Sequence, residues 1–138
     1  MKILKFGGSS VANAVNIKKV IKIIFQALKK GENILVVVSA LGGVTDKLIE
    51  LASLAGQKDN QGKNLMEAIV AQHKKVIQEL IVAKNQKNAL AEMKKKFHEL
   101  DELLKGISLL KELSSRSLDS VMSFGEQLSS LIISQAIK

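Results

Sequence analysis

The residues best suited to chemistry in this sequence lie around two pairs of adjacent glycines. The first pair, Gly7 and Gly8, is followed by Ser9, and Lys5 precedes it at the end of an apolar run. Adjacent glycines after a buried strand let the backbone approach a ligand closely, and N–H groups at a following helix start bind anionic oxygens. Lys5 is placed to meet charge that develops on a transferring phosphoryl group. A tight turn with an exposed lysine is the alternative, and this loop alone does not separate the two.

A second glycine pair repeats the arrangement. Gly42 and Gly43 follow an apolar run and Ser39, and Thr45 comes next as a candidate helix cap. If both runs are neighbouring parallel strands, the two pairs face one crevice at the edge where open α/β sheets bind ligands. This coincidence favours anion binding over two unrelated turns. The spacing matches neither the phosphate-binding loop G-x-x-x-x-G-K-[ST] nor the dinucleotide fingerprint G-x-G-x-x-G.

A third candidate lies near the carboxyl end, in the run Ser123-Phe124-Gly125-Glu126. A glycine inside a helix costs about 1 kcal/mol relative to alanine, so Gly125 indicates close packing or ligand approach. Glu126 offers a carboxylate that can accept hydrogen bonds from a substrate ammonium group. An ordinary surface charge is the competing interpretation, and the residue types alone favour it.

These residues need elements to position them, and the first part of the chain predicts a βαβ unit. Residues 2–6 and 34–38 are short apolar runs that end in Gly or Ser, which predicts two buried strands. Between them, apolar residues recur at helical spacing, and Lys30-Gly31 supplies a stop. These residues are Ile17, Val20, Ile21, Ile24, Phe25 and Leu28. A right-handed crossover then makes the strands parallel, with both carboxyl ends at one edge.

The rest of the chain contains no proline and is predicted to be helical. We expect a helix over 44–55, a polar loop over 57–62, and a pair of long helices joined by a turn at 85–88 and ended by Gly106. A last helix is predicted after the serine-rich segment 114–117. The predicted fold class is therefore α/β, with a parallel βαβ unit followed by several long helices.

Composition and charge narrow the classes of partner. The apolar content of 46% is enough for a core in one domain over residues 1–138. The net charge of +8 invites a nucleic-acid hypothesis, because clustered cations bind phosphate backbones. However, Arg116 is the one arginine and the sequence has no Trp or Tyr, whereas base reading and strand stacking favour these types. The run Lys94–Lys96 lies among carboxylates, as on a solvated helix face. We expect no nucleic-acid partner.

Metal sites and membrane segments are not expected either. The sequence has no Cys, and His73 and His98 are too few to hold a metal alone, so both are predicted to be exposed or half-buried helix residues. The apolar run after Met1 is shorter than the ~7–15 residues of a signal-peptide core and the ~18 residues of a membrane span. We therefore expect a cytoplasmic protein.

Together the three motifs resemble those of aspartokinases, which have the amino-acid kinase fold. The run from Lys5 to Val11 is similar to their opening signature Lys-Phe-Gly-Gly-Thr-Ser, with Ser9 in place of the usual Thr. Residues 37–46 resemble their second loop, and residues 123–126 resemble their third motif. The motifs occur in the family's order across essentially the whole chain. The resemblance implies a parallel-rich sheet between helical layers.

The resemblance also implies a reaction and a role for each candidate residue. The reaction is transfer of the ATP γ-phosphoryl group, with Mg²⁺, to the side-chain carboxylate of L-aspartate, which opens lysine, threonine and methionine biosynthesis. Lys5 would stabilise the transferring group. The phosphate loops would contain Gly7, Gly8, Ser9, Gly42 and Gly43. The aspartate site would contain Ser39, Thr45 and Glu126, with Glu126 on the ammonium group.

Further expectations concern the parent protein. The resemblance implies that a nucleotide-binding half and regulatory ACT domains follow Lys138, so we expect this chain to be an amino-terminal portion that is inactive alone. Residues 104–110 resemble those of bifunctional aspartokinase–homoserine dehydrogenases. Unpaired strand edges favour self-association, which predicts a homo-oligomer. The alternative function is a helical interaction module in which the glycine loops are only turns.

Overall fold

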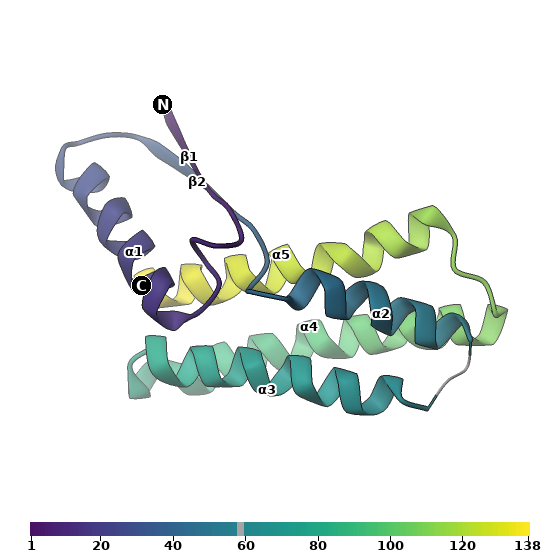
Figure 1. The fold of residues 1–138 in the computed structure, drawn as a ribbon. Coiled ribbons are helices and arrows are strands. Elements are labelled where there is room, and N and C mark those ends of the chain that lie inside the picture. Colours follow the sequence, from purple (N-terminus) through teal and green to yellow (C-terminus); the bar gives the residue numbers. More distant parts are fainter. Residues whose placement is uncertain (58–59) are drawn as a thin grey trace.

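The computed structural model describes residues 1–57 and 60–138, and within these ranges the chain forms two strands and five helices (Figure 1). In chain order they are β1 (Lys2–Phe6), α1 (Ala14–Lys29), β2 (Ile34–Val38), α2 (Val44–Gly56), α3 (Gly62–Leu80), α4 (Ala83–Leu110) and α5 (Ser115–Ile137). The predicted βαβ unit followed by long helices is confirmed. Residues 58–59 of the loop predicted over 57–62 lie outside the described residues.

The two strands pair in parallel, in a register that runs from Lys2 opposite Ile34 to Phe6 opposite Val38. Their bounds are those predicted, but the prediction that both strands are buried is wrong for one of the two faces. Ile3, Leu35 and Val37 are 61%, 48% and 42% exposed. Side chains alternate between the faces of a strand, so these three share one open face. The other face packs against the core through Phe6, Ile34, Val36 and Val38.

Helix α1 connects the strands and is fixed at both ends. The Asn13 side chain caps its start by accepting a hydrogen bond of 3.0 Å from the backbone N–H of Asn16. Gly31, with a φ of 72°, follows its last turn. The predicted apolar stripe is too wide, because Phe25 and Leu28 are 43% and 46% exposed. The buried stripe consists of Ala14, Ile17, Val20, Ile24 and Ala27.

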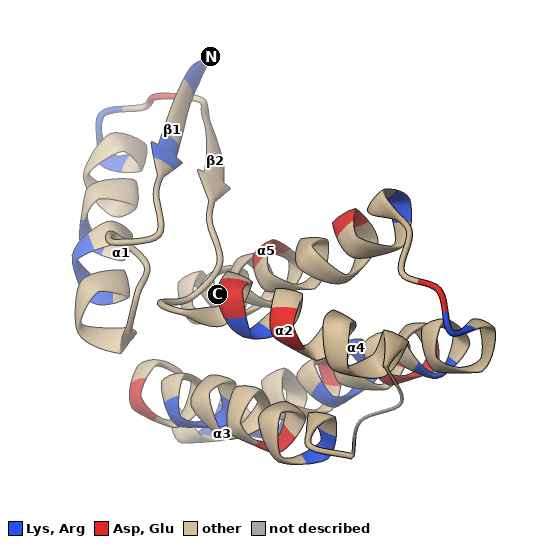
Figure 2. Cartoon of the chain, turned by 45° about the vertical axis from the view of Figure 1, so that its right-hand side comes forward, with Lys and Arg blue, Asp and Glu red and all other residues tan. Residues whose placement is uncertain are grey.

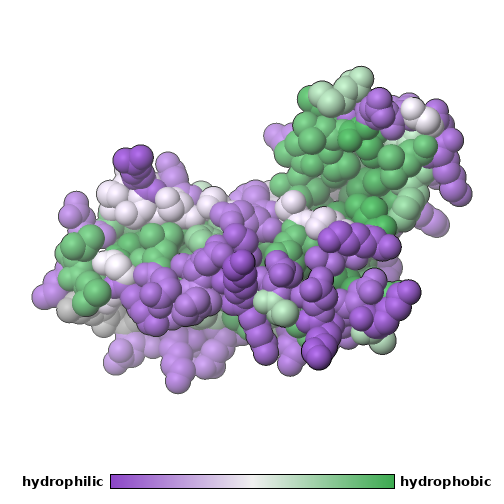
Figure 3. Space-filling view, turned by 180° about the vertical axis from the view of Figure 1, so that it is seen from behind, coloured by the Kyte–Doolittle hydropathy of each residue, from purple (hydrophilic) through white to green (hydrophobic). Residues whose placement is uncertain are grey.

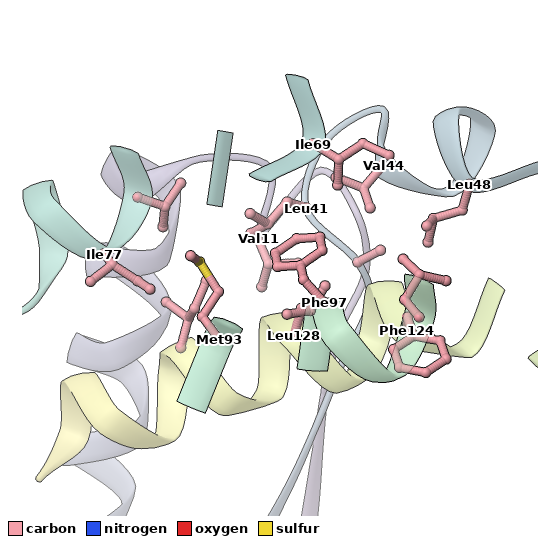
Figure 4. Close-up of a cluster of buried hydrophobic side chains, with 14 of the residues drawn as sticks. Val11, Leu41, Val44, Leu48, Ile69, Ile77, Met93, Phe97, Phe124 and Leu128 are labelled. Carbon is pink, nitrogen blue, oxygen red and sulfur yellow. The ribbon is translucent and has the colours of Figure 1, made fainter. Parts of the chain in front are cut away.

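Helices α2 to α5 form a bundle around the main core. Side chains from all four helices meet there, and the loops before α1 and α2 add Val11 and Leu41 (Figure 4). Among the largest fully buried side chains are Leu48, Ile69, Ile77, Met93, Leu100, Leu128 and Ile132. The apolar faces of these helices therefore pack against one another within the bundle.

Two predicted boundaries of the long helix pair are wrong. The chain turns at Ile81 and Val82 rather than at 85–88, and the Gln86 side chain donates a 2.8 Å hydrogen bond to the Ile81 carbonyl. Gly106 does not end α4, which continues to Leu110 and stops at Lys111 with a φ of 52°. A single helical glycine costs only about 1 kcal/mol. Burial of Leu104 and Ile107 on either side offsets that cost.

The last helix starts inside the serine-rich segment rather than after it. Ser114 is the N-cap, and its hydroxyl accepts a 3.1 Å hydrogen bond from the backbone N–H of Ser117. Helix α5 then passes along α2 and α4 and reaches the sheet, where Ile133 and Ile137 line a small hollow together with Val36 and Val38. It therefore joins the bundle to the strand end of the molecule (Figure 1).

Candidate active site

The loop after β1 is held by its own backbone and by one buried side chain. The N–H of Ser10 donates to the Gly7 carbonyl over 3.0 Å, which closes a turn at the first glycine pair. The Asn16 side chain donates to the Ser9 carbonyl over 2.9 Å. Val11 is fully buried in the core. The loop is thus anchored, while Gly7, Gly8 and Ser9 stay exposed.

The loop after β2 is built in the same way. The N–H of Ser39 donates to the Phe6 carbonyl over 3.1 Å and extends the strand ladder by one bond. Ala40 and Leu41 are buried and anchor the loop. Gly43 has a φ of 73° and forms the N-cap of α2. A residue with a side chain is strained in this left-handed conformation, which explains the glycine at this position.

The two loops lie against each other. The N–H of Gly42 donates to the Ala12 carbonyl over 3.1 Å, and a Cβ added at Gly42 would lie 3.2 Å from both Ala12 Cβ and Ala12 O. A Cβ added at Gly8 would lie 3.9 Å from the Ser39 hydroxyl. The structure therefore brings both predicted glycine pairs together at the carboxyl ends of the strands.

Lys5 and Ser39 lie on the same side of the sheet. Lys5 pairs in register with Val37, and alternation along β2 puts Ser39 on the same face as Val37. This is the open face, where Lys5 is exposed and makes no ion pair with any described residue. A free ammonium group beside two glycine turns is suited to binding an anion.

The start of α2 adds backbone donors to the same region. The N–H of Val44 donates to the Leu41 carbonyl, whereas the N–H of Gly43 meets no acceptor within residues 1–57 and 60–138. No side chain caps this helix start, and Thr45 lies in its first turn, half-buried. A helix start carries a partial positive charge and unsatisfied N–H groups, so it stabilises a nearby anion.

Helix α5 approaches the second loop through Gly125. A Cβ added at Gly125 would lie 2.8 Å from Ala40 Cβ and 3.4 Å from Leu48 Cδ1. Such a short contact excludes any side chain without a shift of the helix, so the close packing predicted for this glycine is present. Glu126 follows directly, and its exposed side chain makes no ion pair or hydrogen bond with any described residue. Its carboxylate is free for a ligand.

Two site residues escaped the sequence analysis. The amide of Gln72 on α3 donates a 2.8 Å hydrogen bond to the Gly42 carbonyl, and its oxygen accepts one of 2.9 Å from Lys47 Nζ on α2. Both bonds are partly buried. A lone Gln inside a polar helix face gives no sequence signal, because only the tertiary packing brings it to the loop.

His73, the next residue on α3, is fully buried, so the prediction that it is exposed or half-buried is wrong. Its Nδ1 lies 2.7 Å from the Ile69 carbonyl, and its ring packs edge-on against Phe97 with centroids 5.4 Å apart. Burial lowers the pKa of His73, the bond to Ile69 acts in the opposite direction, and the charge of Lys47 lowers it further. The ring is a neutral core residue, and its Nε2 has no partner among the described residues.

The surface charges are mixed, and lysines spread over α1, α3 and α4 (Figure 2). Some pair with carboxylates on the same helix, as Lys96 does with Glu99 at 2.9 Å and Lys105 with Asp101 at 2.8 Å. In the described part of the chain, no group of three or more His, Cys, Asp or Glu side chains is arranged to hold a metal ion. None of the described helices combines the length and apolarity that crossing a membrane requires.

Comparison with known proteins extends these observations. The sequence model of the amino acid kinase family matches residues 1–138. Aspartokinase 2, chloroplastic, of Arabidopsis thaliana is 34% identical over 135 residues, which cover 96% of this chain and 23% of that protein. The bifunctional aspartokinase/homoserine dehydrogenase 2, chloroplastic, of the same plant is 28% identical over 134 residues, 97% of this chain and 14% of that protein.

The fold also matches a solved structure. The crystal structure of E. coli aspartokinase III in complex with aspartate and ADP superposes with a TM-score of 0.82 at 24% sequence identity, over 99% of this chain and 28% of that one. The chain thus spans less than a quarter of the length of the first curated relatives that it matches.

Proposed function

Because the chain belongs to the amino acid kinase family, we propose that it carries phosphate-binding and aspartate-binding residues of an aspartate kinase. In the proposed reaction, a side-chain carboxylate oxygen of L-aspartate attacks the γ-phosphorus of ATP. The bond from that phosphorus to the β–γ bridging oxygen breaks, and the products are 4-phospho-L-aspartate and ADP. The similarity to named aspartokinases supports this reaction, as do the aspartate and ADP bound by the E. coli enzyme.

The observation that carries the proposal is the hydrogen bond from the Gly42 N–H to the Ala12 carbonyl, which holds the two glycine loops together. Phosphoryl transfer needs positioning and charge neutralisation more than a covalent protein group. Closely spaced backbone donors beside a free ammonium group provide both. In the proposal the phosphate oxygens lie against Gly7, Gly8, Ser9, Gly42 and Gly43. Lys5 meets the charge on the transferring group.

Aspartate is assigned to Ser39, Thr45 and Glu126, which lie in or beside the second loop. Ser39 and Thr45 offer hydroxyl groups to a carboxylate, and the free carboxylate of Glu126 accepts hydrogen bonds from the ammonium group of the substrate. Gly125 supports this assignment, since its packing on Ala40 brings α5 next to the second loop. The partial positive charge at the start of α2 suits the carboxylates of an amino acid, and the carboxylate of Glu126 suits its ammonium group.

Magnesium belongs to the same proposal. The described residues offer no cluster of carboxylates for it, so it would reach the site on the phosphate oxygens of ATP. When bound there, Mg²⁺ would supply positive charge to the β- and γ-phosphates. The free ammonium of Lys5 and the start of α2 fit a phosphate group that already carries its own cation.

The biological setting follows from this reaction and is proposed with it. The product leads to lysine, threonine and methionine, and the enzyme would work in the cytoplasm as a homo-oligomer. A parent joined to homoserine dehydrogenase is also compatible, because one such bifunctional protein is among the relatives.

Lys5→Ala tests the function directly, with Lys2→Ala as a matched control on the same strand. Lys2 is also exposed, and its ammonium group forms an ion pair with Glu32 at 3.3 Å. In the gene product that contains these residues, we expect Lys5→Ala to reduce aspartate-dependent ADP formation by orders of magnitude and Lys2→Ala to leave it unchanged. Equal rates for Lys5→Ala and the parent would remove the role of Lys5. No aspartate-dependent turnover in the parent would favour a helical interaction module.

A further inference from the structure

The second glycine loop is held by a side chain from helix α3. Gln72 of α3 reaches the Gly42 carbonyl at 2.8 Å, and Lys47 of α2 reaches the other end of the same amide at 2.9 Å. A lysine ammonium group only donates hydrogen bonds, so the Gln72 oxygen must face Lys47. The Gln72 NH₂ group therefore faces the Gly42 carbonyl, and Lys47 fixes this orientation.

Gln72 controls the direction of one peptide group. The Gly42 carbonyl and the Gly43 N–H belong to the same planar trans peptide, in which they point in opposite directions. A carbonyl held toward α3 therefore turns the Gly43 N–H away from α3. That N–H has no acceptor among the described residues. The neighbouring peptide is fixed as well, since the Gly42 N–H is bonded to Ala12.

Without Gln72 this peptide has little to hold it. Glycine crosses between positive and negative φ at low cost, and Gly43 has a φ of 73°. A peptide between two glycines can therefore flip, which would exchange the directions of the carbonyl and the N–H. A carbonyl that points at a phosphate repels it, whereas an N–H binds it.

We propose that Gln72 is a positioning residue, oriented by Lys47, which keeps the Gly43 N–H directed at a phosphate group of the nucleotide. The identity of this ligand rests on the proposed function. The orientation of the Gly42–Gly43 peptide by Gln72 is independent of the proposed function, because it follows from the hydrogen bonds alone. The two parts can therefore be tested separately.

The first test needs no enzymatic activity. In the 138-residue chain, Gln72→Met keeps the length of the side chain and removes both hydrogen bonds, and Gln72→Glu keeps an acceptor for Lys47 but cannot donate to Gly42. Both should shift the amide resonances of Gly43 and Val44 in ¹H–¹⁵N spectra. Gln78→Met, an exposed position on the same helix, should leave these resonances in place. An unchanged Gly43 resonance in both Gln72 variants would overturn the proposal.

The second test uses the active gene product. Misplacing one binding group costs up to about a hundred-fold in rate, so we expect Gln72→Met and Gln72→Glu to lower kcat/KM for ATP by about ten- to a hundred-fold. The affinity for aspartate should change much less. The double variant Lys47→Glu with Gln72→Lys restores a donor to Gly42 and an acceptor behind it, and it should recover much of the loss. Lys47→Met is the fallback if the Gln72 variants fail to fold.

The outcomes separate the two proposals. If the parent shows no aspartate-dependent ATP use, the proposed function fails, while the Gly43 resonances still report on Gln72. If the resonances shift but kcat/KM for ATP stays at the parent value, Gln72 is a purely structural residue and the positioning role is lost. Failure of the double variant to recover activity would also count against it.

Discussion

The strand end and the helical bundle of this molecule bury their apolar residues to very different extents. In the bundle, Leu48, Leu100 and Leu128 are fully buried and surrounded by residues of neighbouring helices. At the strand end, Ile3 and Leu35 are 61% and 48% exposed, and the part of the molecule that holds the strands shows a broad hydrophobic surface (Figure 3). The helices of the bundle bury their apolar faces against one another, whereas one face of the sheet is exposed.

The candidate site lies where these two regions meet, and this position explains how it can be both ordered and accessible. Val11 and Leu41 anchor the two loops in the bundle core (Figure 4). The close packing of Gly125 on Ala40 brings α5 against the second loop. Lys5 and the glycines remain on the open side. Rigid support on one side and free donors on the other is the arrangement that preorganised binding needs.

The largest expected effect comes from a cavity in the bundle. Leu128→Ala removes a side chain with no exposed surface, so we expect it to lower the free energy of unfolding by about 2–5 kcal/mol. Leu35→Ala makes the same chemical change at the strand end, where half of the side chain is already in water, and should cost well under half as much. Urea unfolding of both variants measures the difference. Equal losses would show that the two ends are packed alike.

A smaller effect is expected at the junction of the two regions. Gly125→Ala places a Cβ only 2.8 Å from Ala40 Cβ, so α5 or the loop must shift. Overpacking of this kind typically costs about 1–3 kcal/mol, part of which the better helix propensity of alanine offsets. The double variant Gly125→Ala with Ala40→Gly removes the clash and should recover much of the loss. If Gly125→Ala has the same free energy of unfolding as the parent, the loop moves away from the added Cβ at no cost.

Much of this fold could be predicted from the sequence because local patterns decide it. The apolar runs 2–6 and 34–38 became β1 and β2 with unchanged bounds, and both glycine pairs became turns at the carboxyl edge. The helix predicted over 44–55 matches α2, which extends one residue further to Gly56. In each case a run of residues and its stop signal agree, so no distant contact is needed to place the element.

The errors lie where distant contacts decide the outcome. Gly106 is a stop signal by type, but packing of α4 against its neighbours continues the helix through it. His73 is a polar residue followed by two lysines, which predicts exposure, but its ring packs against Phe97 of α4. Gln72 reaches the second loop only because α3 packs beside α2. The strands were predicted to be buried, yet Ile3 is 61% exposed, and no described element covers its face.

The buried His73 predicts an acid sensitivity that is small near neutral pH and grows below it. Burial lowers its pKa in the folded chain below the ordinary value of 6.5, while the unfolded chain keeps that value. As the pH falls through about 6.5, His73 binds a proton in the unfolded state but stays neutral in the folded state. The free energy of unfolding therefore falls until the pH reaches the lowered pKa of the folded state.

The two histidines of the chain provide matched variants for this prediction. His73→Met should flatten the fall in stability between pH 7 and 5, measured by urea unfolding, because it removes the group that titrates differently in the two states. His98 is exposed, and His98→Gln should leave the slope unchanged. If His73→Met keeps the slope of the parent, the acid sensitivity arises elsewhere.

The smallest effect is expected on the open face of the sheet, and its size decides whether that face is open in solution. Val37→Thr keeps a β-branched residue and changes a side chain that is 42% exposed, so its cost should stay within about 0.5 kcal/mol. Val36→Thr makes the same change on the face that packs against α5, and should cost more. Similar large costs at both positions would require a cover over Val37. A second copy of the chain would then be revealed by an unfolding midpoint that rises with protein concentration.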